Sequence, residues 1–198
     1  SDKIKQEIAC TLINMSLCGA IGDNLDAFMA ELSLRELVVL MVSDNSQYNQ
    51  LGALILGNLA SVPAVGDYLV DGGALMPLIA VANRSNLQTQ RCVAFALANL
   101  CVTKRHRTSL VEAGGLLTVV SMGYGSDIND QIAMAKLLRC IATDDDLVEP
   151  IVEAGVLEVL AHNAARNTNV QVLRATLECV HSLSLTETAR VTIAGVKS

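Results

Sequence analysis

The sequence predicts an all-α protein built from stacked copies of one helical unit, a right-handed α–α superhelix. Three observations support this fold class. Hydrophobic residues make up 52% of the 198 residues but aromatic residues only 3%, so the apolar side chains are mainly aliphatic and suit close packing of helix on helix. Similar segments recur along the chain at a regular interval of about 40 residues. Glycine and polar turn residues separate these segments at similar intervals.

The first set of similar segments has a glycine-containing turn followed by an aliphatic run. It comprises residues 69–79 (LVDGGALMPLI), 110–120 (LVEAGGLLTVV) and 151–160 (IVEAGVLEVL). The starting positions Leu69, Leu110 and Ile151 are evenly spaced, and a degraded copy starts one further interval along, at Val191. A period of roughly 40 to 47 residues is typical of repeat proteins with two or three helices per unit.

A second set of segments lies between the first. These are residues 8–16 (IACTLINMS), 52–60 (GALILGNLA), 93–101 (VAFALANLC), 134–142 (MAKLLRCIA) and 177–185 (LECVHSLSL). Aligned on Asn14, Asn58, Asn99, Cys140 and Ser182, they follow one another with nearly the same period as the first set. Each unit is therefore expected to contain a short helix, a glycine turn, a second helix, a polar loop and a longer third helix.

About four full repeats, bracketed by partial ones, are expected in a single domain over residues 1–198. The full units are expected at 24–61, 64–103, 104–144 and 145–185, with partial units at 1–18 and 187–198. Within the unit 64–103, the helices are expected at about 65–71, 74–82 and 89–103. The glycines at 72–73, 114–115 and 155 are expected to end the short helices, where positive φ or close backbone approach is needed.

The three-helix unit, the EAG turn and the third helix of the AxxNLA type resemble armadillo repeats, as found in catenins, karyopherin alpha and vacuolar anchoring proteins. The resemblance covers nearly the whole chain. It implies a non-enzymatic scaffold or adaptor that holds a partner polypeptide in a concave groove lined by the third helices. The identity of that partner does not follow from the fold.

One stripe of residues on the third helices is the expected binding groove. The position aligned with Asn58 and those four and eight residues earlier share one face of each helix. The candidate binding residues are Asn14, Gln50, Leu54, Asn58, Arg91, Phe95, Asn99, Lys136, Arg174, Glu178 and Ser182. Gln6, Cys10, Ile132 and Cys140 complete the stripe.

Asparagine recurs in this stripe at Asn14, Asn58 and Asn99. In armadillo proteins with asparagine at this place, the amide holds the backbone of an extended peptide, and the resemblance implies the same role here. The alternative is that these amides bond to the neighbouring helix and set the repeat spacing. Karyopherin alpha has Trp four residues before the Asn, where only Phe95 is aromatic in this chain, so we do not expect binding of nuclear-localisation peptides.

Charge gives a second indication about the partner. Arg91, Lys136 and Arg174 make the C-terminal part of the stripe basic, although the chain has a net charge of −6. They favour a partner with acidic groups, with ordinary solvated side chains as the alternative. The negative net charge argues against nucleic acid as a partner, because phosphate binding depends on clustered Lys and Arg.

No signature of catalysis, cofactor binding or metal binding is present in the sequence. It contains no GxSxG, phosphate loop or dinucleotide fingerprint, and its three His residues lack metal-ligand spacing. The runs 104–107 (KRHR) and 143–146 (TDDD) are one repeat apart, so they are expected to lie on equivalent turns of adjacent repeats and to pair weakly.

The six cysteines lie in apolar helical patterns without a CxxC pair, which indicates buried thiols in a reducing compartment. We therefore expect a cytoplasmic protein, with a nuclear or peripheral membrane location through other regions as alternatives. The longest apolar runs are far shorter than the roughly 20 residues that span a bilayer, so insertion into a membrane is not expected.

Two other functions stay open on the sequence alone. One is a structural, assembly or membrane-anchoring role through the convex helices or the open repeat ends, including self-association. The other is the substrate-binding arm of a multidomain ubiquitin ligase.

Overall fold

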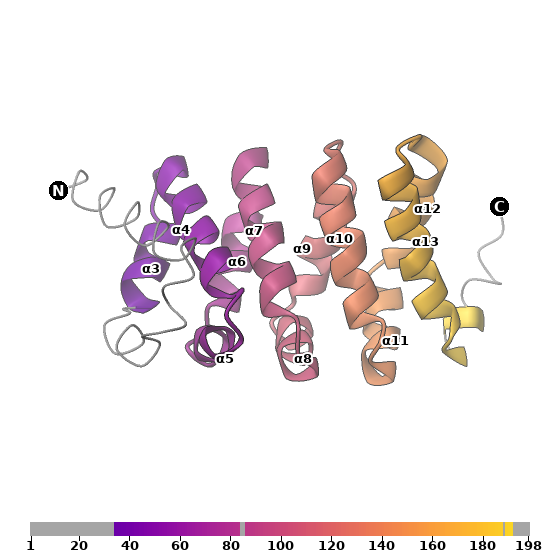
Figure 1. The fold of residues 1–198 in the computed structure, drawn as a ribbon, viewed down its shortest axis with the longest axis horizontal. Helices are drawn as coiled ribbons and strands as arrows, with labels where there is room; N and C mark the ends of the chain where they lie inside the picture. The colour runs from indigo at the N-terminus through magenta and orange to yellow at the C-terminus, as the bar shows by residue number, and fades with distance from the viewer. Residues whose placement is uncertain (1–33, 84–85, 188, 192–198) are drawn as a thin grey trace. The chain divides into compact units, whose positions relative to one another are not determined.

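The computed structural model describes residues 34–83, 86–187 and 189–191 (Figure 1). Over these residues it contains the helices α3 to α13 and no strand. The chain divides into two compact units, unit 1 up to Leu100 and unit 2 from Cys101, and each is described by itself. The expected partial repeat at 1–18, the start of the unit at 24–61 and most of the segment 187–198 lie outside the described residues.

The described part of unit 1 contains one complete three-helix repeat and the last two helices of the repeat before it. Its helices are α3 (Leu34–Met41), α4 (Ser46–Leu59), α5 (Pro63–Asp71), α6 (Leu75–Ala82) and α7 (Leu87–Leu100). The long helices α4 and α7 pack side by side, while α3 packs on α4 and α6 packs on α7 (Figure 1). The short helix α5 contacts both long helices.

Unit 2 contains two complete repeats. Their helices are α8 (Lys104–Glu112), α9 (Gly115–Gly123) and α10 (Ile128–Ile141), then α11 (Asp145–Glu153), α12 (Val156–Arg166) and α13 (Val170–Ser184). Each helix contacts its counterpart in the other repeat: α8 contacts α11, α9 contacts α12, and the long helices α10 and α13 pack together. The predicted order of a short, a second and a longer third helix is confirmed.

Each long helix begins after a side chain that caps its N-terminus. The capping residues occupy the same position in successive repeats and are Asn45, Asn86, Asp127 and Asn169. Asn45 Oδ1, for example, accepts a 2.9 Å hydrogen bond from the backbone N–H of Gln47. These caps satisfy N–H groups that have no acceptor within the helix, and so they fix where the long helices start.

A second set of amides satisfies carbonyls in the last residue of each second helix or in the turn directly after it. The bonds run from Asn49 to Met41 and Ser43, from Gln90 to Ala82 and from Gln131 to Gly125. The donors occupy one aligned position of the repeat, and the last two bonds measure 3.0 and 2.8 Å. Because the last carbonyls of a helix lack intrahelical donors, these amides hold each second helix against the third helix that follows it.

The glycine turns between the first and second helices adopt the predicted conformation. Gly73, Gly114 and Gly155 have φ values of 81°, 73° and 84°. A side chain with a Cβ is strained in this left-handed region, which explains why glycine recurs there.

The predicted boundary between the third helix of one repeat and the first helix of the next is wrong by a few residues. The third helix expected at 89–103 spans Leu87–Leu100. It starts earlier because Asn86 Oδ1 accepts from the Thr89 N–H at 3.0 Å. Thr103 instead caps the following helix α8, where its Oγ1 accepts from the His106 N–H at 3.3 Å.

The interior of each unit is aliphatic, as the composition predicts. Ile55, Leu56 and Leu97 are fully buried in unit 1, and Leu137 and Leu138 in unit 2. Burying one such side chain contributes about 1.5 to 3 kcal/mol to the stability of the fold.

No single helix among the described residues is both long and apolar enough to cross a membrane. The helices α5 and α6 reach the required length and hydropathy only when taken together, and the chain bends by 81° between them.

Candidate binding surface on the third helices

The predicted stripe in unit 1 lies on two neighbouring helices. Its members are Gln50, Leu54 and Asn58 on α4 and Arg91, Phe95 and Asn99 on α7. The packing of α4 on α7 brings the two groups together. Phe95 is the most exposed of the six side chains, at 39%, whereas Asn58 is only 9% exposed. Asn14 lies outside the described residues.

Phe95 and Asn99 both contact Gly57 on α4. A Cβ atom on Gly57 would lie 2.5 Å from Phe95 Cδ1 and 3.2 Å from Ala96 Cα, so glycine is what allows the ring and the α7 backbone to approach. Asn99 Nδ2 donates a 2.8 Å hydrogen bond to the Gly57 carbonyl. The side chain of Asn99 therefore joins two repeats, which agrees with the alternative that these amides bond to the neighbouring helix. It also stays partly exposed.

Asn58 differs from Asn99. Its side chain forms no hydrogen bond with any residue in the described part of the chain, although its polar atoms are not fully enclosed. The backbone carbonyl of Asn58 accepts a 2.6 Å bond from Ser61 Oγ. Its predicted role with a peptide therefore stays a prediction.

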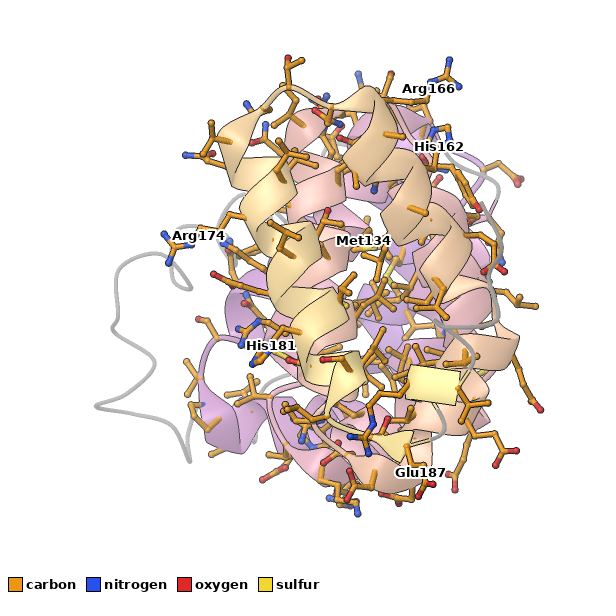
Figure 2. The ribbon with its side chains drawn as sticks, turned by 90° about the vertical axis from the view of Figure 1, so that its right-hand side faces the viewer. Met134, His162, Arg166, Arg174, His181 and Glu187 are labelled. Atoms are coloured by element: carbon orange, nitrogen blue, oxygen red, sulfur yellow. The ribbon has the colours of Figure 1, made fainter. Side chains whose placement is uncertain are left out.

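The predicted stripe in unit 2 is charged. Lys136 lies exposed on α10, and Arg174, Glu178 and Ser182 lie on α13. Glu178 Oε1 accepts a 2.9 Å bond from Arg174 Nε, and Ser182 Oγ donates to the Glu178 carbonyl at 3.2 Å within α13. Figure 2 shows Arg174 and His181 on one side of α13, away from His162 and Arg166 on α12.

Arg139 belongs to this surface but is absent from the predicted stripe. Its Nε atom lies 3.8 Å from Glu178 Oε2, which links α10 to α13. The repeat alignment places Arg139 at the position of Gly57 and Glu178 at the position of Phe95. This alignment is the signal that could identify Arg139, because the contact between Gly57 and Phe95 joins the long helices of unit 1.

Comparisons with known proteins give the class of the fold. No family model and no curated protein matches the sequence. An engineered protein matches with 26% identity and a TM-score of 0.86, over 98% of this chain and 82% of its own. A designed armadillo repeat protein in complex with the peptide (KR)4 matches with 18% identity and a TM-score of 0.81, over 89% of this chain and 74% of its own.

A computationally designed armadillo repeat protein for modular peptide recognition also matches, with 18% identity and a TM-score of 0.83 over 96% of this chain and 82% of its own. The chain has an armadillo-like repeat-solenoid fold. The predicted fold class is thereby confirmed.

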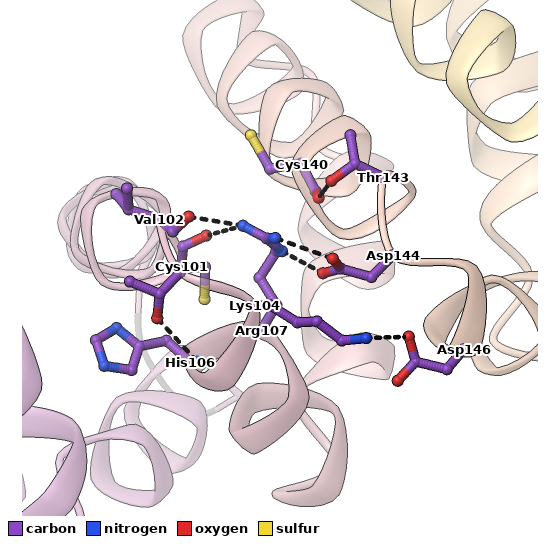
Figure 3. A network of polar contacts seen from close by, with 10 residues as sticks. Cys101, Val102, Lys104, His106, Arg107, Cys140, Thr143, Asp144 and Asp146 are labelled. Carbon is purple, nitrogen blue, oxygen red and sulfur yellow. Dashed lines mark hydrogen bonds and ion pairs between the residues drawn. The ribbon is translucent and has the colours of Figure 1, made fainter.

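The armadillo-like repeats of unit 2 are also joined by ion pairs between their first helices (Figure 3). Arg107 donates to both carboxylate oxygens of Asp144, at 2.6 and 3.1 Å, and the two side chains are only 11% and 9% exposed. Arg107 Nη1 donates further to the carbonyls of Val102, at 2.7 Å, and Cys101, at 3.3 Å. Although Asp144 occupies the N-cap position of α11, its side chain makes no capping bond.

The exposed Lys104 and Asp146 form a second pair beside the first, at 2.8 Å. Their hydrogen bond raises the pKa of Lys104 and lowers the pKa of Asp146. The predicted pairing of the two charge runs is confirmed. The enclosed pair of Arg107 and Asp144 was not predicted, because the sequence does not show which charged side chains become buried.

The remaining His, Cys, Asp and Glu side chains bear on metal binding and on thiol reactivity. Among the described residues no three His, Cys, Asp or Glu side chains are grouped as metal ligands. Cys92, Cys101, Cys140 and Cys179 are free thiols. Burial raises the pKa of Cys101 and of Cys179 to about 12, so these two thiols stay protonated and poorly reactive at neutral pH.

Proposed function

We propose that this chain is a non-enzymatic cytoplasmic scaffold that binds a polypeptide segment of a partner protein along the exposed face of its third helices. The designed armadillo protein that binds (KR)4 supports a peptide as the type of ligand. Nucleic acid is not proposed, since the chain carries a net charge of −6.

The exposed ring of Phe95 is the observation that carries this proposal. One side of the ring is fixed against Gly57, so it does not have to be ordered when a ligand binds. Phe95 is 39% exposed, and Gln50 and Arg91 are partly exposed on the same pair of packed helices. An aromatic side chain that is already held in place is typical of residues that dominate binding energy.

A polypeptide suits this surface better than a small molecule. The third-helix face of unit 1 combines one aromatic ring with amide side chains at Gln50 and Asn58. Amides offer donors and an acceptor, which match the backbone groups of an extended peptide irrespective of its sequence. The free cysteines of the described residues support a reducing compartment for the protein.

Selection from a random peptide library with the purified 198-residue chain tests the proposal. We expect selected peptides to bind more than tenfold more weakly to Phe95→Ala, and more weakly to Gln50→Ala. Met76→Ala should bind unchanged, because Met76 is 59% exposed on α6 and not on a third helix. Thermal melts of all three variants serve to confirm that they fold.

The proposal would be contradicted if no peptide were selected. It would also be contradicted if Met76→Ala changed the affinity of the selected peptides while Phe95→Ala and Gln50→Ala left it unchanged.

A further inference from the structure

The long helices of unit 2 carry an excess of positive charge on their exposed faces. We call Lys136, Arg139 and Arg174 the α10/α13 basic face. Glu178 is the one acidic residue on α13, and the acid within α10, Asp130, is 4% exposed and therefore not on the surface. The two helices thus carry three cations and one exposed carboxylate, in a chain whose net charge is −6.

Glu178 does not satisfy these cations fully. Its 2.9 Å contact with Arg174 is a hydrogen bond, but the 3.8 Å contact with Arg139 is too long for one. The Nε atom of Arg139 is buried, but the side chain as a whole is 41% exposed and donates no hydrogen bond within the described residues. Lys136 is exposed and forms no ion pair within the described residues. Guanidinium groups with open donors match carboxylates well, because the planar fork bonds both oxygens.

We propose that the α10/α13 basic face binds the side-chain carboxylates of an acidic polypeptide segment, and that Glu178 occupies the place of a partner carboxylate in the unbound chain. This inference rests on the proposed function, whose ligand class it narrows. Glu178 is 43% exposed and held by exposed ion pairs, so a ligand carboxylate displaces it at small energetic cost. Glu178 therefore lowers the affinity for weakly charged ligands and selects segments with several carboxylates.

Binding of a fluorescein-labelled peptide of alternating Glu and Gly, measured by fluorescence anisotropy with the whole chain, tests this inference. The matched probes replace Glu by Gln or by Lys. We expect the Glu peptide to bind more tightly than both, and its affinity to fall as sodium chloride is raised from about 0.05 to 0.5 M, since salt screens exposed charges.

Substitutions of basic and acidic residues on the α10/α13 basic face should change the affinity for the Glu peptide in opposite directions. Arg174→Gln and Arg139→Gln should each weaken binding of the Glu peptide by roughly twofold to fivefold, the range of exposed ion pairs. Glu178→Gln should strengthen it by a similar factor, because it removes the competing carboxylate. Arg166→Gln is the matched control: Arg166 is also exposed in unit 2 but lies on α12, away from Arg174 (Figure 2).

Three results would overturn the inference: equal affinity for the Glu and Gln peptides, weaker binding to Glu178→Gln, or the same loss with Arg166→Gln as with Arg174→Gln. Tighter binding of a short single-stranded DNA than of the Glu peptide would overturn it in favour of phosphate ligands. If library-selected peptides lack acidic residues and depend on Phe95 but not on Arg174, the inference fails while the proposed function stands.

Discussion

The contact between neighbouring long helices is built differently in the two units, although the aligned positions are the same. In unit 1, the glycine at position 57 gives room to the ring of Phe95, and its carbonyl accepts a hydrogen bond from Asn99. In unit 2, Arg139 stands at the Gly57 position and Glu178 at the Phe95 position, and the two form an ion pair. An aligned repeat position therefore determines which helices meet but not the chemistry that joins them.

A contact between the second helices of unit 2 resembles the contact that Asn99 makes with Gly57 in unit 1. On the second helices of unit 2, Asn163 Nδ2 donates to the Gly123 carbonyl at 3.1 Å, and a Cβ atom on Gly123 would lie 2.9 Å from Val159 Cγ2. This is the same arrangement as at Gly57, but Val159 and Asn163 are only 1% and 3% exposed. The arrangement thus joins repeats without any ligand. On α7 it lies at the surface, where Phe95 is 39% exposed.

The largest effect is expected at the enclosed ion pair of unit 2. Arg107→Ala leaves the carboxylate of Asp144 nearly buried without its partner, and should lower the free energy of unfolding by about 2 to 4 kcal/mol, slightly less than for a fully buried pair. Urea denaturation measures this loss. Lys104→Ala, at the exposed pair nearby, should have little effect. Equal effects of the two substitutions would show that enclosure of the charges does not matter.

The glycine contact of unit 1 should show the next largest effect. Gly57→Ala places a methyl group against the Phe95 ring and the α7 backbone, and overpacking of this kind costs about 1 to 3 kcal/mol. Gly66→Ala is the matched control, because its Cβ would meet only the Ala60 carbonyl oxygen at 3.7 Å, and alanine favours a helix over glycine by up to about 1 kcal/mol.

Phe95→Ala should reduce the effect of Gly57→Ala when the two are combined, since it removes the nearest obstacle. If Gly57→Ala and Gly66→Ala change the urea midpoint in the same direction, the difference between the two contacts is smaller than the geometry indicates.

Asn99 and Ser182 occupy aligned positions, but their substitution by alanine should lower the stability by different, smaller amounts. Asn99→Ala removes the hydrogen bond between two repeats and should lower the stability by about 0.5 to 1.5 kcal/mol. Ser182→Ala should change it little, because Ser182 Oγ donates only to a carbonyl of its own helix. Differential scanning calorimetry of both variants provides the measurement. An equal shift of the two melting temperatures would contradict a structural role of the Asn99 amide across repeats.

The smallest effect is a pH dependence at the exposed pair of unit 2. The bond with Lys104 lowers the folded-state pKa of Asp146 below the ordinary value of 3.8, so its contribution to stability is present above about pH 4 and is lost as the pH falls through the lowered pKa. Melting temperatures of the wild-type chain and Asp146→Asn should therefore converge as the pH falls below that lowered pKa. In a Lys104→Gln background the difference should be smaller, because only the backbone hydrogen bond of Asp146 then lowers its pKa.

The sequence was sufficient to predict the repeat, the order of its helices and the glycine turns, because each is a local pattern that recurs once in every repeat. The end of the third helix at Leu100 was predicted wrongly, since Thr103 fits either a helix or an N-cap. The extended backbone of Thr103, with φ −91° and ψ 152°, and its hydrogen bond from the His106 N–H show that it is an N-cap. The candidate residues within the described part of the chain lie on the long third helices, whereas Asn14 lies outside it.

The partners of those residues could not be predicted in the same way. Successive helical residues differ by about 100° in direction, so a shift of one residue moves a side chain from the exposed stripe to the contact with the next helix. This explains why Arg139 is absent from the predicted stripe although its neighbour Cys140 is included. Whether Asn99 faces a ligand or a neighbouring carbonyl likewise depends on the rotation of α7 about its axis, which the spacing of residues does not specify.

The most direct test of peptide binding at the third helices is a map of amide chemical shifts on the ¹⁵N-labelled chain during titration with a library-selected peptide. We expect the largest changes at Gln50, Arg91 and Phe95 on α4 and α7, with no change at Met76 on α6. Changes concentrated on α5 and α6 with none on α4 and α7 would contradict it.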